Sequence, residues 1–103
     1  MPNDSLQISE LKQRYRLSLK EKADTVSEFK RLIMQASKEE LPICLEHCRA
    51  VLHKLAGSSG MYGYQEICAL CRRTMGLIDD GDITHLEITL SQLEKMLVKD
   101  ATS

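Results

Sequence analysis

Apolar residues recur every three or four positions along nearly the whole chain, the spacing of a buried helical face. No segment shows the sustained alternation of apolar and polar residues that a strand requires. The pattern predicts a short helix over residues 9–17, followed by longer amphipathic helices. Their inward faces are Ala23, Val26, Phe29, Ile33 and Ala36; then Leu41, Leu45, Cys48, Leu52 and Leu55; then Tyr64, Ile67, Leu70, Cys71, Thr74 and Ile78; and finally Ile83, Leu86, Leu90, Leu93 and Leu97.

Local signals predict where these helices begin and end. Capping boxes of the S-x-x-E type start at Ser18 and at Ser37, and they predict the start of the second and third helices. The third helix is expected to end near Gly60 or Gly63, where glycines accumulate. The acidic segment 78–82 contains a glycine and predicts a turn before the last helix.

The predicted fold is all-α. Amphipathic helices with short connections cannot bury their apolar faces singly, so they are expected to pack together. The sequence therefore predicts an antiparallel four-helix bundle, with the short additional N-terminal helix lying across one end. A chain of 103 residues forms one domain, 1–103, whose ends are expected to fray over about residues 1–7 and 99–103.

Charge and hydropathy exclude several functional classes. The 14 Lys and Arg residues are balanced by 15 Asp and Glu, and no basic block favours nucleic acid or an anionic membrane. No apolar run is long enough to cross a bilayer. The first residues, MPNDSLQISE, lack the pattern of a secretory signal, which predicts a cytoplasmic protein. The four cysteines are accordingly expected to be reduced thiols.

His53 is the candidate for chemistry. At about 100° per residue, it points roughly 120° away from the apolar face of the third predicted helix. The positions one to two turns further on hold Ala56, Gly57 and Gly60, which are small enough to leave an imidazole ring accessible. A glycine within a helix costs about 1 kcal/mol relative to alanine, which indicates a purpose other than stability. The alternative is an ordinary exposed histidine beside a glycine-rich helix end.

Residues 53–64, HKLAGSSGMYGY, resemble the signature of histidine-containing phosphotransfer (HPt) domains. That signature is a histidine, an aliphatic residue two positions on, a glycine followed by small residues, and a second glycine. Chain length, helix order and the last predicted helix also fit, so the resemblance covers nearly the whole chain. The matching positions are His53, Leu55, Gly57, Ser58, Ser59 and Gly63.

The resemblance implies a phosphocarrier in two-component phosphorelay signalling. His53 would accept a phosphoryl group on Nε2 from the aspartyl phosphate of one response-regulator receiver domain and pass it to another. The Mg²⁺ ion would come with the receiver, so no cofactor is expected, and no kinase-type glycine loop is present. The expected partners are receivers and a hybrid sensor kinase. The chain is expected to be a monomer, and both a free-standing protein and a module of a larger hybrid kinase fit.

The sequence departs from the family pattern at two positions. Ala56 stands where the family usually has a lysine that attends the phosphoryl oxygens. Arg49 and Lys54 are the nearest basic substitutes, and Arg49 is the better one because it lies one turn before the histidine on the same face. Met75 stands where some members have a glutamine near the imidazole. The ring would then be oriented by another group, such as a backbone carbonyl or Ser58.

Several expectations and alternatives remain beside the histidine. Receivers are expected to dock on the face around His53, including Ala56, Gly57 and Gly60. A structural or adaptor bundle that has lost phosphotransfer is an alternative, which the Ala56 departure favours. A second alternative is a zinc or redox site built from the four cysteines, although cysteines on apolar faces usually act as small buried hydrophobes. Those cysteines are Cys44, Cys48, Cys68 and Cys71.

Overall fold

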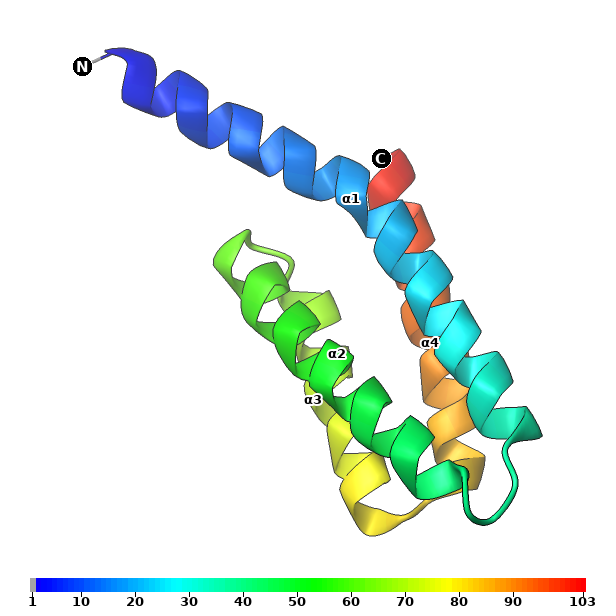
Figure 1. The fold of residues 1–103 in the computed structure, drawn as a ribbon. Helices are drawn as coiled ribbons and strands as arrows, with labels where there is room; N and C mark the ends of the chain where they lie inside the picture. The colour runs from blue at the N-terminus through cyan, green and yellow to red at the C-terminus, as the bar shows by residue number, and fades with distance from the viewer. Residues whose placement is uncertain (1) are drawn as a thin grey trace.

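The computed structural model describes the backbone from Pro2 to Ser103 and the side chains from residue 7 onward. Its elements are α1 (Pro2–Gln35), α2 (Leu41–Met61), α3 (Gln65–Asp80) and α4 (Ile83–Thr102). As Figure 1 shows, α1 runs beside α4 and α2 runs beside α3, and α3 also packs on α4. Contact between α1 and α2 is the slightest in the bundle. The expected all-α antiparallel four-helix bundle is confirmed.

The separate short N-terminal helix is not found, because α1 is continuous from Pro2 to Gln35. Ser18 does not cap a new helix there. Its hydroxyl donates to the carbonyl oxygen of Tyr15 at 2.6 Å, a bond made within a continuing helix, and it accepts from Lys22 Nζ at 2.9 Å. A capping box begins a helix only where the backbone before it leaves helical geometry. No proline or glycine lies between residues 3 and 41, so nothing interrupts α1 at Ser18.

The first turns of α1 extend past the ends of the other helices (Figure 1). Ile8 is 55% exposed and Leu11 is 48% exposed, although both continue the face that Tyr15 and Leu19 bury further along. The molecule accordingly measures 55 × 21 × 19 Å. The backbone is helical from Pro2 on, and Met1 lies outside the described residues. The expected fraying of residues 1–7 stays a prediction.

At the C-terminal end, α4 continues to Thr102. One reason is a contact that sequence distance conceals: Arg16 of α1 donates to the carbonyl oxygens of Ala101 at 2.9 Å and Ser103 at 3.3 Å. A guanidinium near the last turn satisfies carbonyl groups that have no partner within the helix.

The predicted apolar faces form the core of the bundle. Most of their residues are buried, and Phe29, Leu41, Leu45, Tyr64, Leu70, Ile78 and Ile83 pack against it while partly exposed. Ala36 is the exception, because α1 ends one residue before it. Within the part of the chain that the structure describes, no helix combines the length and hydropathy needed to cross a membrane.

Short connections hold α2, α3 and α4 in register. The two hydrogen bonds of the capping box at Ser37 are present: the Ser37 amide donates to Glu40 Oε1 at 2.9 Å, and the Ser37 hydroxyl accepts from the Glu40 amide at 3.2 Å. They close a turn before α2, which itself begins at Leu41 with Glu40 as its N-cap and without a side-chain cap. Gly81 ends α3 in the left-handed conformation, with φ of 71°. Asp82 then caps α4 by accepting from the amide of His85 at 3.2 Å. The predicted turn at 78–82 is therefore shortened to these last two residues.

Candidate functional site

His53 lies on α2 and is exposed, as the helical wheel predicts. Its direction follows from the burial of Cys48, Leu52 and Leu55, which rotate α2 so that residue 53 is directed away from the core. Among the side chains that the structure describes, none hydrogen-bonds the His53 ring. The imidazole is therefore free to meet a group arriving from outside the protein.

The open space beside His53 comes from Gly57, one turn further on. Gly57 is exposed, and a Cβ atom added there would meet nothing within 4 Å. Its φ angle is not positive, so neither the backbone conformation nor a close neighbour requires glycine. Because a helical side chain leans toward its own N-terminus, any larger residue at 57 would extend over the imidazole.

Of two other residues expected to be open, Ala56 is buried and Gly60 is only partly exposed. Ala56 is only 5% exposed, and a Cβ atom on Gly60 would contact Cys68 Sγ of α3 at 3.4 Å. Both positions lie on the side of α2 where α3 packs, and a helical wheel cannot tell on which side of the apolar face the neighbouring helix will lie. The expectation that Ala56 is open beside His53 was wrong, because Ala56 is buried. Gly60 keeps partial exposure, and its part in receiver docking stays a prediction.

Arg49 lies one turn before His53 and is held by a residue that the sequence did not point to. Its Nε donates to Asp79 Oδ1 at 2.7 Å and its Nη2 donates to Asp79 Oδ2 at 3.0 Å, forming a bidentate pair across α2 and α3. The hydrogen bonds hold the pKa of Asp79 below its usual range and raise the pKa of Arg49. Both groups are therefore charged near neutral pH. The pairing joins residues 30 positions apart, so no local pattern could reveal it.

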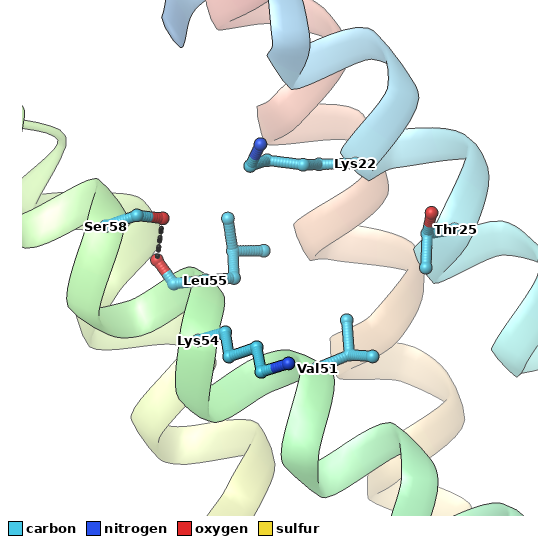
Figure 2. A pocket seen from close by; sticks show the side chains of 6 residues that line it. All are labelled: Lys22, Thr25, Val51, Lys54, Leu55 and Ser58. Carbon is cyan, nitrogen blue, oxygen red and sulfur yellow. Dashed lines mark hydrogen bonds between the residues drawn. The ribbon is translucent and has the colours of Figure 1, made fainter.

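Lys54, the other basic candidate, belongs to the opposite flank of α2. It lines a cavity of about 300 Å³ between α1 and α2, which Figure 2 shows from close by. One residue along a helix is a rotation of about 100°, which separates Lys54 from the direction of His53. The cavity does not include His53, and its lining residues are Lys22, Thr25, Val51, Lys54, Leu55 and Ser58.

Ser58 is engaged away from the histidine. Its hydroxyl lies 2.8 Å from the hydroxyl of Tyr15. It also donates to the carbonyl oxygen of Leu55 at 3.3 Å, as Figure 2 shows. The Tyr15 ring stacks on Tyr62 with 4.4 Å between centroids, and burial raises the pKa of Tyr15. Ser58 therefore connects α2 to α1, and orienting the His53 ring is not its role in this structure.

Met75 occupies the corresponding place on α3 and is buried. A buried thioether packs against apolar neighbours and offers only a weak acceptor for hydrogen bonds. Met75 therefore does not supply the hydrogen-bonding amide of the glutamine that some family members carry at this position.

The cysteines lie in the bundle and are all free. Burial raises the pKa of Cys48 and of Cys71 to about 12, so both thiols are protonated near neutral pH. Within residues 7–103, no group of three or more histidine, cysteine, aspartate or glutamate side chains could hold a metal ion. Cys48, Cys68 and Cys71 are buried in the core, where they pack as small apolar groups.

The remaining histidines have different surroundings. His85 Nδ1 lies 2.6 Å from Asp82 Oδ2 at the start of α4, and His47 is exposed on the charged flank of α2. Neither has the glycine one turn later that leaves His53 open. His53 is thus distinguished by its surroundings as well as by its sequence motif.

A comparison with protein families matches residues 15–99, more than four-fifths of the chain, to the Hpt domain. The chain belongs to the Hpt domain family. Hpt domains are phosphocarriers of phosphorelay signalling, and they interact with receiver domains and histidine kinases. Comparison with curated proteins and with solved structures gives no match. The matched segment of this Hpt chain begins at Tyr15, so the projecting first turns of α1 lie outside it.

Proposed function

We propose that His53 is the phosphoacceptor of this Hpt domain, and that it carries a phosphoryl group between receiver domains. The observation that supports this most is an exposed imidazole beside the open position of Gly57, in a chain matched to the Hpt family. A neutral imidazole is a good nucleophile near pH 7, and the phosphoramidate that it forms is reactive enough to be passed on.

The proposed transfer is an exchange of one phosphorus bond for another. The lone pair of His53 Nε2 attacks the phosphorus of a receiver's aspartyl phosphate, and the bond from phosphorus to the aspartate oxygen breaks. The carboxylate leaves with that electron pair, and the proton on the other ring nitrogen can be lost to solvent. Phosphoryl transfer needs chiefly positioning and charge neutralisation. The Mg²⁺ ion of the receiver would supply much of that neutralisation, so the proposal needs no cofactor bound to this chain.

Arg49 is the proposed phosphoryl ligand on this side of the interface, in place of the lysine that Ala56 replaces. Residues four apart on a helix are neighbours, so the guanidinium can reach a group attached to His53. Lys54 is the more distant cation, because it faces the cavity against α1. In this proposal the chain acts as a cytoplasmic monomer and the receiver docks over His53 and Gly57.

The test uses the whole chain and two phosphoryl donors: potassium phosphoramidate and a set of phosphorylated receiver domains. His53→Gln should abolish acid-labile phosphate incorporation from both donors while helicity stays unchanged. Matched controls are His47→Gln and His85→Gln, which should label like the parent protein. Labelling retained in His53→Gln would refute the assignment. A parent protein that binds receivers but never becomes labelled would instead support the adaptor bundle.

Incubation of the parent protein with ATP and Mg²⁺ tests the expected lack of kinase activity. Without a receiver or a kinase present, no phosphohistidine should form. A phosphohistidine signal under these conditions would contradict the proposal that the chain only carries phosphoryl groups.

A further inference from the structure

The ion pair between Arg49 and Asp79 lies on the same side of the α2–α3 hairpin as His53. Two contacts define the register of this hairpin: Gly60 lies against Cys68, and Arg49 binds Asp79. In both pairs the residue numbers have the same sum, as expected for two antiparallel helices that keep one register. Asp79 therefore approaches α2 at the level of Arg49, one turn from His53.

We propose that Asp79 is a positioning residue for phosphotransfer. In the unphosphorylated protein it would hold the Arg49 guanidinium beside His53, and it would release Arg49 to the phosphoryl group once His53 is phosphorylated. This inference rests on the proposed function of His53 and adds a regulatory exchange of partners to it.

The geometry of the pair suits such an exchange. Two parallel N–H···O bonds fix the orientation of the guanidinium, so Arg49 stays ordered before a phosphoryl group arrives. The side chains are nevertheless 45% and 52% exposed, and water and salt screen an ion pair of that kind. The pair is therefore specific in geometry but weak enough to be broken by a stronger competitor.

A phosphohistidine is a stronger competitor than a carboxylate. Its phosphoryl group carries more negative charge and offers three acceptor oxygens, which match the fork of guanidinium donors. The group would be attached one turn from Arg49 on the same helix, at high effective concentration. Because Lys54 is directed to the other flank, Arg49 is the basic side chain of α2 best placed to respond.

The exchange predicts opposite effects for changes to the two partners. Removing the charge of Asp79 frees Arg49 and also removes a negative neighbour, so the phosphoryl dianion becomes more favourable. Removing Arg49 takes away a cation and leaves the carboxylate of Asp79 unpaired, so the dianion becomes less favourable. An ion pair with only a structural role would change the stability of both variants without shifting the ionisation of the phosphoryl group in opposite directions.

The experiment loads the full chain with potassium phosphoramidate and then removes the donor. In loading, the phosphorus–nitrogen bond of the donor breaks, a phosphorus–nitrogen bond to His53 forms, and ammonia leaves with the imidazole proton. Phosphorus NMR then follows the second ionisation of the phosphoryl group against pH. Nitrogen-15 NMR follows the Arg49 Nε–H signal before and after loading.

Arg49→Gln should raise the apparent pKa of the phosphoryl group by about 0.2 to 0.7 pH unit, and Asp79→Asn should lower it by a similar amount. Arg49→Lys should recover part of the difference, since lysine keeps the charge but not the paired donors. The matched controls are Asp80→Asn and Arg73→Gln, both exposed on α3 and without a hydrogen-bonded partner among the side chains of residues 7–103. In the parent protein, the Arg49 Nε–H signal should shift on loading.

Equal effects of Asp79→Asn and Asp80→Asn, or an Arg49 signal that does not move on loading, would overturn the partner exchange while leaving His53 as the phosphoacceptor. A parent protein that takes up no phosphoryl group at His53 would overturn the proposed function, and this inference with it. The two failures are distinguishable because loading by phosphoramidate is measured before any effect of Arg49 or Asp79.

Discussion

Gly57 tests whether this chain keeps a destabilising glycine in α2 so that the His53 ring stays accessible. An alanine in an exposed helix interior is more favourable than glycine by about 1 kcal/mol, largely because glycine loses more conformational freedom on folding. The structure adds no opposing steric cost, because a Cβ atom at residue 57 would meet nothing within 4 Å. Gly57→Ala should therefore stabilise the fold by up to about 1 kcal/mol, which for a domain of this size raises Tm by about 4–8 °C.

Gly57→Gln separates access from stability. Glutamine is also a better helix former than glycine, so the variant should fold at least as well as the parent protein. Its side chain would lean toward the N-terminus of α2 and cover the His53 ring, so transfer from a phosphorylated receiver should slow by tenfold or more, which corresponds to about 1.4 kcal/mol in the barrier. Ala50→Gln is the matched control: it places the same side chain on the exposed surface of α2, leaning away from His53.

Circular dichroism melts and single-turnover transfer rates on the parent protein and the variants measure both effects. Gly76→Ala serves as the control for stability, because residue 76 is exposed on α3 and equally free of neighbours, and it should give a similar rise in Tm. Transfer by Gly57→Gln at the parental rate would refute the access argument. A lower Tm for Gly57→Ala would show instead that residue 57 packs against something.

Two further predictions concern the bundle itself. Burial raises the pKa of Cys48 and Cys71 to about 12, so both thiols should resist alkylation at pH 8 in the native protein while the partly exposed Cys44 reacts. Mass spectrometry on native and urea-unfolded samples measures the extent of alkylation at each cysteine. Rapid alkylation of all four cysteines in the native state would contradict the prediction. Hydrogen bonds from the amide and side chain of His85 lower the pKa of Asp82, so its contribution to stability is present above the unfolded pKa and is lost as pH falls through the lower folded value. Denaturation at pH 7 and pH 3 should show this loss, and Asp82→Asn, which keeps a capping oxygen without a titrating charge, should lose less stability between the same two pH values.

Much of the site's framework could be predicted from local sequence. The end of α3 and the start of α4 depend on neighbouring residues, the left-handed Gly81 and the capping Asp82. The exposure of His53 follows from the apolar face of its own helix. Such features are visible in a sequence because their physical causes lie within one or two turns of the chain.

What only the tertiary structure decided depends on how the helices meet. The side on which α3 packs buries Ala56 and places Cys68 against Gly60, and a single helical wheel does not contain that information. The hairpin register brings Asp79 to Arg49, and the position of α1 brings Tyr15 to Ser58. Even the continuity of α1 through Ser18 is shown by the structure and not by its local signal, because residues with capping potential also fit within a helix whose apolar face packs on its neighbours.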